Sequence, residues 1–141
     1  MTKKSSQAIR KSKELAGRST ICHFATTDGR QPQVRAMAFV LKRNGEIWLS
    51  TFAKSRKIKQ LKKNPRVEVY FTDETGIHCK IDGTCTLSTE IADKKKQWKS
   101  QPGLIKFFDS PKDPGLVVIR FKPKKYEYMS FGDFAYEVAD V

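Results

Sequence analysis

Hydroxyl and cationic side chains gather at the start of a short helix predicted by the run TFAKSRKIKQLKKNPRV, residues 51–67. Ser55 is a typical N-cap residue, and Asn64-Pro65 ends the helical pattern. The N-terminal end of a helix carries about half a positive charge, so a cation there costs roughly 0.3 to 1 kcal/mol. Arg56 and Lys57 nevertheless occupy that end. They are either solvated, or they face an anion that the free helix N–H groups also bind.

Another cation stands on the strand predicted by PQVRAMAFV, residues 32–40. Alternation puts Arg35 on one face with Met37 and Phe39, and puts small apolar residues on the other. A guanidinium rarely sits unpaired on an otherwise apolar face. Its partner is therefore a neighbouring acid, the solvent at a strand end, or a ligand.

A hairpin brings these two segments together. Asn44-Gly45 is a strong turn signal, and it pairs residues 34–41 with residues 47–51, after which the chain enters the basic helix. One cleft can then hold the following side chains: Arg35, Ser50, Thr51, Ser55, Arg56 and Lys57. Hydroxyl groups, cations and helix N–H donors together are the chemistry of a phosphate site. A solvated basic face is the competing interpretation.

The rest of the chain supplies a mainly β framework. Apolar alternation and turn residues predict strands at 20–27, 34–42, 46–52, 66–72, 77–88, 116–122 and 126–131. Helices are expected at 5–16 and 91–99, with a further turn or two at 103–108. Six or seven mainly antiparallel strands with two or three peripheral helices favour closure into a barrel, which removes exposed sheet edges. Gly83 is expected to mark a bulge or a barrel corner.

Composition limits the class of protein. A length of 141 residues predicts a single domain, 1–141, and a formal net charge of +13 attracts polyanions of several kinds. Three cysteines without a C-x-x-C spacing lie in apolar runs, so they are expected to be buried in a reducing compartment. No segment has the apolar length of a membrane span or of a signal sequence. The expected location is cytoplasmic.

Three segments resemble one known family. STFAKSRKIKQLKKNPRV looks like the phosphate-binding segment of the pyridoxamine 5'-phosphate oxidase-like FMN-binding split barrels, and VRAMAFV is similar to the strand that precedes it. IDGTCTLS resembles the family's next strand, and the order and spacing agree over residues 20–88. The general stress protein branch is the closest in length and in its N-terminal helix. The resemblance implies a six- to seven-stranded antiparallel split β-barrel that binds FMN.

The resemblance also implies roles for the phosphate-binding residues. Arg56 and Lys57 would bind the FMN phosphate. Ser55 and Thr51 would donate their hydroxyl groups, and Ser50 would lie nearby. No metal site is expected.

A second group of residues would surround the flavin ring. Arg35 would lie towards the phosphate or the pyrimidine side, and the backbone of Ala36 and Met37 would flank the ring. His78 falls where the family often places a polar side chain that reaches the flavin of the partner subunit, although a surface-facing histidine is an equal alternative. The resemblance therefore implies a homodimer with the flavin at its interface.

The C-terminal part departs from the family. The vitamin B6 oxidases have a Trp near the position of Met129 followed by an Arg-x-His segment, whereas this chain reads YEYMSFGDFAYEVADV. The expected function is an FMN-binding protein and FMN-dependent oxidoreductase of unknown substrate, with no catalytic residue assigned. A nucleic-acid-binding barrel is an alternative from another class, because aromatic residues stand between basic ones. A split barrel that uses the deazaflavin F420 or haem is a further alternative.

Overall fold

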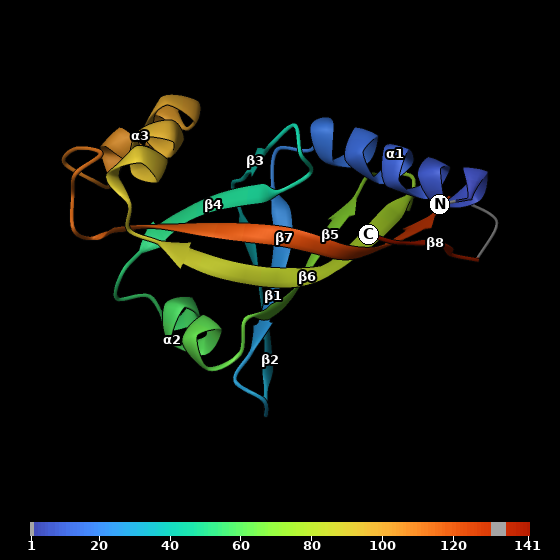
Figure 1. The fold of residues 1–141 in the computed structure, drawn as a ribbon, viewed down its shortest axis with the longest axis horizontal. Coiled ribbons are helices and arrows are strands. Elements are labelled where there is room, and N and C mark those ends of the chain that lie inside the picture. Colours follow the sequence, from blue (N-terminus) through green and yellow to red (C-terminus); the bar gives the residue numbers. More distant parts are fainter. Residues whose placement is uncertain (1, 131–134) are drawn as a thin grey trace.

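An antiparallel sheet with helices at its periphery forms the structure, which is a computed structural model describing residues 2–130 and 135–141 (Figure 1). The helices are α1 (Lys3–Gly17), α2 (Arg56–Lys63) and α3 (Ile91–Ser100), and a 3₁₀ turn, η1 (Pro102–Lys106), follows α3. The strands are β1 (Cys22–Thr27), β2 (Pro32–Met37), β3 (Val40–Leu41), β4 (Ile47–Phe52), β5 (Arg66–Thr72), β6 (His78–Ser88), β7 (Leu116–Met129) and β8 (Glu137–Asp140).

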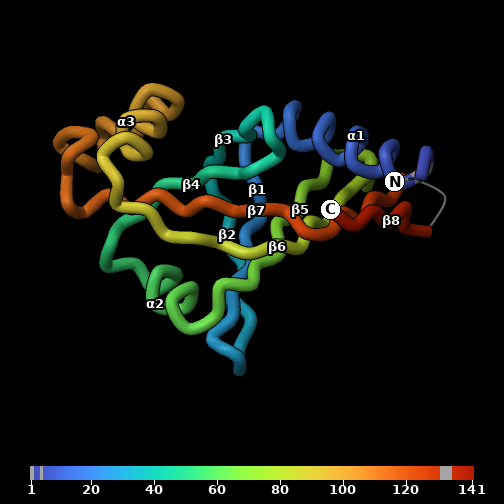
Figure 2. The backbone as a smooth tube through the Cα atoms, viewed as in Figure 1, coloured from blue at the N-terminus to red at the C-terminus, as the bar shows by residue number. Residues whose placement is uncertain are grey.

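The strand order explains why the sheet curls. Seven strands follow the path β2-β1-β5-β6-β7-β4-β3, every pair is antiparallel, and β8 pairs with β7 beside this path. The two ends of the path, β2 and β3, are joined by Ala38-Phe39 alone, so the ends must approach each other. The result is an open half-barrel, whose course Figure 2 traces. The expected mainly β split barrel with two or three peripheral helices is confirmed.

The core fills the concave side of this sheet. Inward-facing residues of neighbouring strands, among them Phe24, Leu49, Val69 and Phe121, are fully buried. The predicted alternation of residues 66–72 is confirmed, because Val67, Val69 and Phe71 are buried. Helix α1 lies against β5–β8, whereas α3 contacts β4 and β7 at the other end of the sheet (Figure 1). These positions leave the start of α2 and the loop after α3 free to border a cavity.

Three predicted strands were wrong in their limits. The expected strand 34–42 is interrupted at Ala38-Phe39, where the chain passes from one end of the sheet to the other. The expected strands 116–122 and 126–131 are one strand, β7, which continues through Pro123; residue 131 lies outside the described residues. Pro123 is tolerated because it stands opposite Gly83, where the register shifts as a bulge, so a missing N–H costs little. The bulge predicted at Gly83 is confirmed.

The three cysteines are free and buried, as expected. Burial raises the pKa of Cys22 and Cys85 to about 12 and that of Cys79 to about 11. Thiols with such high pKa values are poor nucleophiles, because the thiolate is the reactive form. They serve as small apolar core residues. In the described part of the chain, no helix combines the length and apolar character that crossing a membrane requires.

Candidate functional site

A cavity of about 560 Å³ opens where four segments meet: the end of β4, the β2–β3 junction, the start of α2 and the loop after α3. This volume is within the range of pockets that hold a cofactor or small ligand, roughly 300 to 1,000 Å³. Six of the nine predicted binding residues line it: Arg35, Ala36, Met37, Ser50, Thr51 and Lys57. The folding of the chain thus brings together residues that the sequence placed on three separate elements.

Arg35 enters the cavity from β2 on the half-buried face predicted for it. Its guanidinium donates to the hydroxyl of Thr26 at 2.8 Å and to the side-chain oxygen of Gln60 at 3.3 Å. It also donates to the backbone oxygens of Phe24 and Gln33, at 3.3 and 3.4 Å. All these acceptors are neutral. Of the interpretations left open above, a neighbouring acid is excluded among residues 2–130 and 135–141, where Arg35 joins no ion pair.

The end of β4 and the start of α2 together add a second cation and two hydroxyl groups. Lys57 donates to the hydroxyl of the buried Thr51 at 2.9 Å, and Thr51 in turn donates to Ser55 at 3.4 Å. Ser55 is the N-cap residue, as predicted, but its side chain makes no capping hydrogen bond in the described structure. The Ile58 N–H donates to the Ser55 carbonyl at 3.2 Å, so among the described residues the N–H groups of Arg56 and Lys57 are the ones left for another acceptor.

The cations of this corner repel one another without compensation. Partial burial, and after it the charge of Arg56, lowers the pKa of Arg35. Partial burial, and after it the charge of Arg35, lowers the pKa of Lys57. None of the three joins an ion pair formed by the described residues. An anion bound here would gain from all of these charges at once.

Ser50 belongs to a neutral polar corner of the same cavity. Its hydroxyl donates to the side-chain oxygen of Gln101 at 2.8 Å and accepts from the amide of Gln97 at 2.9 Å. Gln97 is fully buried on α3, and Gln101 follows the helix. Ser50 therefore fastens α3 to β4, and its hydroxyl is already engaged by protein groups.

An aromatic wall borders the same cavity as the cationic corner, and the sequence interpretation missed it. Phe52 contacts Phe108 with ring centroids 4.8 Å apart and Phe107 at 6.2 Å, and all three line the cavity. Phe107 and Phe52 are exposed despite their size. Two consecutive Phe residues after a Gly-containing loop were the available signal, although alone they did not indicate which cavity they would border.

Three predicted residues lie outside the cavity lining. Ser55 accepts a hydrogen bond from Thr51, and Thr51 lines the cavity. Arg56 is exposed at the start of α2, close enough to Arg35 for its charge to lower the pKa of that residue. His78 lies at the far end of β6, where its ring nitrogens contact the Gly76 carbonyl and the Tyr136 hydroxyl, each at 2.9 Å. A single chain thus does not bring His78 to the cationic corner.

Comparison with known proteins gives the family. The sequence model of the family described as pyridoxamine 5'-phosphate oxidase matches residues 8–130. The chain belongs to this family. The match spans both halves of the cavity, from Arg35 to the aromatic wall, so the pyridoxamine 5'-phosphate oxidase family assignment covers the whole candidate site. No curated protein matches the sequence.

Solved structures share the fold of this pyridoxamine 5'-phosphate oxidase family member. A Clostridium acetobutylicum protein related to general stress protein 26 has a TM-score of 0.81 at 24% identity, covering 96% of this chain and 95% of that one. General stress protein 26 of Bacillus anthracis has a TM-score of 0.79 at 19% identity, with 94% and 98% covered. An FAD-binding protein of Mesorhizobium loti has a TM-score of 0.66 at 17% identity, with 83% and 88% covered. At these identities the likeness concerns the fold.

Proposed function

We propose that this chain binds FMN in the cavity between β2, β4, α2 and the loop after α3, and that it acts as a flavin-dependent oxidoreductase. The observation that carries the proposal is the uncompensated positive charge of Arg35 and Lys57 beside the uncapped start of α2. A phosphate monoester is the ligand group whose charge and acceptor oxygens match those donors.

The residues fit the parts of FMN in a simple way. Arg35, Lys57 and Arg56 supply cations for the phosphate, and Thr51 and Ser55 supply hydroxyl groups. The backbone of Ala36 and Met37 and the rings of Phe52 and Phe107 supply a flat, largely apolar border for the ring system. When bound, the flavin supplies hydride or electron transfer, and the chain's own residues bind, orient and desolvate it. The FAD-binding protein of Mesorhizobium loti, which shares the fold, supports a flavin.

The proposal extends to a homodimer in the cytoplasm. The family resemblance implies that the flavin lies at a dimer interface, where the partner's His78 would approach it. The three buried free thiols agree with a reducing compartment. Oxidation of pyridoxamine phosphate is not part of the proposal, because the Trp and the Arg-x-His segment of the vitamin B6 oxidases are missing.

Two other cofactors are alternatives to FMN at this site. Haem is disfavoured because the described residues lining the cavity include no His, Cys or Tyr, its usual axial ligands, although Met37 offers a sulfur. The deazaflavin F420 would use the same cations. Cofactor extraction and mass analysis identify the group that is bound. Nucleic acid, the alternative suggested by the net charge, is not favoured by the family assignment.

The test compares FMN with riboflavin, which has the same ring and lacks the phosphate. Purified protein is expected to bind FMN much more tightly than riboflavin in a fluorescence-quenching titration. Replacing Arg56 and Lys57 together by Ala should weaken FMN binding by several kcal/mol, because each charge-assisted contact contributes about 1.5 to 3 kcal/mol. Protein that neither carries flavin nor takes up added FMN would contradict the proposal.

A further inference from the structure

Two buried polar residues hold the guanidinium of Arg35 in a closed set of hydrogen bonds. Thr26, on β1, accepts from Nη1 through its hydroxyl oxygen at 2.8 Å. Gln60, on α2, accepts from Nη2 through Oε1 at 3.3 Å. The Thr26 hydroxyl donates to the same Gln60 oxygen, which closes a triangle of three side chains. The triangle joins three elements, β1, β2 and α2, at the cationic corner of the cavity.

The burial of these residues needs an explanation. Thr26 is 2% exposed and Gln60 is 8% exposed, and Gln60 is buried on α2 together with Ile58 and Leu61. A buried position of an amphipathic helix normally carries an apolar side chain. A buried amide is tolerated only when it is hydrogen-bonded, and the partners of its oxygen are Thr26 and Arg35. Gln60 is therefore matched to Arg35.

The neutrality of Thr26 and Gln60 is the informative feature. A carboxylate is the usual partner of a half-buried guanidinium, because it compensates the charge. Here an amide and a hydroxyl fix the direction of the guanidinium and leave its charge uncompensated. An arginine held in this way is rigid and still fully attractive to an anion, whereas a carboxylate at position 60 would cancel that attraction.

We propose that Gln60 and Thr26 are positioning residues that aim Arg35 at the phosphate group of the ligand while keeping it unneutralised. The inference rests on the proposed function, since it takes the anion to be the phosphate of FMN. Neither residue lines the cavity, so both would act on the ligand through Arg35 and not by direct contact.

Gln60→Glu is the decisive variant. The glutamate has nearly the same shape as the glutamine, and it gains an ion pair with Arg35, so the thermal midpoint of the ligand-free protein is expected to stay the same or to rise. FMN binding is expected to weaken about ten-fold or more, because a unit charge is added close to the phosphate. Riboflavin binding is expected to stay unchanged, because riboflavin lacks the phosphate. The readout is the ratio of the two dissociation constants.

Thr26 provides a second, independent variant. Thr26→Val keeps the shape and removes the hydroxyl, and it is expected to lower the preference for FMN over riboflavin. Thr26→Ser keeps the hydroxyl and should retain the preference for FMN. Gln31→Glu makes the same change of charge at an exposed turn residue and serves as the matched control. It is expected to leave both dissociation constants unchanged.

The outcomes separate this inference from the proposed function. If wild-type protein shows no preference for FMN over riboflavin, the proposed function itself is wrong. If wild-type protein prefers FMN and both Gln60→Glu and Thr26→Val retain that preference, the positioning role is overturned. Equal losses of affinity for FMN and for riboflavin in both variants would also overturn the positioning role, since that pattern indicates a structural role. If Gln60→Glu does not fold, the comparison of Thr26→Val with Thr26→Ser tests the positioning role.

Discussion

Arg35 and Lys57 bring like charges into one half-buried corner, where the two residues are held by hydroxyl, amide and carbonyl oxygens. Such an arrangement costs folding free energy, because burial and mutual repulsion both disfavour the charged forms. A protein tolerates this cost at a site where a bound ligand offsets it, since strain and uncompensated charge concentrate at functional positions. The corner therefore indicates a binding site more strongly than the large net charge of the chain does.

The pH dependence of binding is expected to follow Lys57. Its pKa lies below the ordinary value of 10.5 in the ligand-free protein, and a bound phosphate would raise it. Binding then takes up a proton, so in the alkaline range, where the ligand phosphate is fully ionised, FMN affinity falls as the pH rises through the lowered pKa of Lys57. In Lys57→Arg this fall should disappear, because a guanidinium stays charged. The measurement is the FMN-to-riboflavin affinity ratio across alkaline pH at fixed ionic strength. A fall that is equally steep in Lys57→Arg would refute the assignment.

At the scale of elements, the bulge at Gly83 sets how β6 and β7 cross. A Cβ atom added at Gly83 would lie 2.2 Å from the backbone oxygen of Lys122 and 2.7 Å from the Phe121 ring. Both contacts are shorter than van der Waals distances allow, and a backbone oxygen cannot rotate away. Only glycine permits this approach of β6 and β7, and β7 pairs with β4, which forms one side of the cavity.

Gly83→Ala is therefore expected to lower the free energy of unfolding by about 2 to 3 kcal/mol, in the range of overpacked cores. Urea denaturation followed by circular dichroism measures this change. Gly17→Ala is the matched control: nothing lies within 4 Å of its added Cβ atom, and Gly17 ends α1. The control should be neutral or stabilise the protein by about 0.4 to 1 kcal/mol. Equal stability of both variants would show that the strands can move apart.

The elements were largely predictable because their signals are local. Alternating residues 66–72, the Asn44-Gly45 turn and the start of α2 each specify their structure within a few residues. The continuity of β7 was not predictable, since Pro123 reads as a break and is tolerated only opposite the bulge at Gly83. Strand β8 was missed for a similar reason, because its pairing with β7 is tertiary.

The candidate site was half predictable on the same grounds. Hydroxyl and cationic residues around the start of α2 share one segment, so their type and spacing were visible in the sequence. Thr26 and Gln60 carry no local signal of their role, because they meet Arg35 only after β1, β2 and α2 have packed. The approach of Phe107 and Phe108 to Phe52 likewise depends on the loop after α3.

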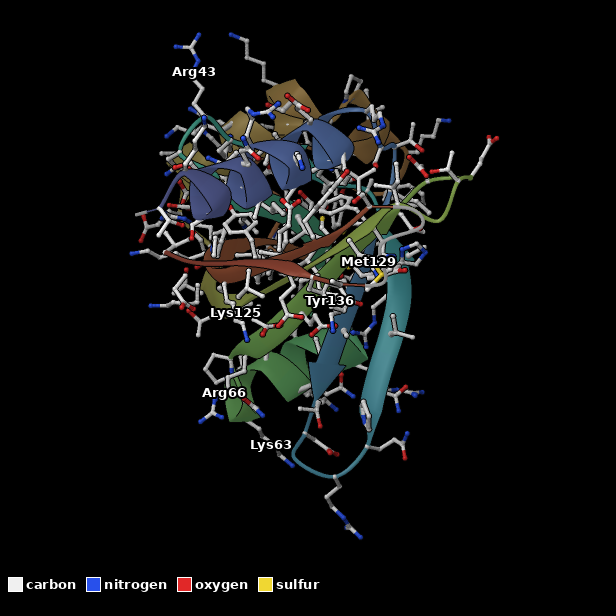
Figure 3. All side chains as sticks on the ribbon, turned by 90° about the vertical axis from the view of Figure 1, so that its right-hand side faces the viewer. Arg43, Lys63, Arg66, Lys125, Met129 and Tyr136 are labelled. Carbon is white, nitrogen blue, oxygen red and sulfur yellow. The ribbon has the colours of Figure 1, made fainter. Side chains whose placement is uncertain are left out.

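At the scale of the whole molecule, the positive charge is spread widely. Arg43, on the β3–β4 hairpin, and Lys63 and Arg66, at the end of α2 and the start of β5, extend outward from distant parts of the surface (Figure 3). A charge of +13 distributed in this way raises the local concentration of anions and speeds their encounter with the cavity. It does not by itself form a binding site. The arrangement of Arg35 and Lys57 supplies the specificity that net charge lacks.

Association of two copies is the remaining whole-molecule prediction. The edge strand β2 exposes an apolar face, on which Val34 is 69% exposed, and β2 lies at an end of the strand path. Exposed apolar edge strands favour association with another chain. Val34→Asp is expected to shift a wild-type dimer towards monomer in sedimentation velocity, because the interface would bury a charge. Ile91→Asp, at a residue 44% exposed on α3, makes the same change elsewhere and should leave the dimer intact. Wild-type protein that sediments as a monomer, or dissociation by Ile91→Asp alone, would exclude β2 as the interface.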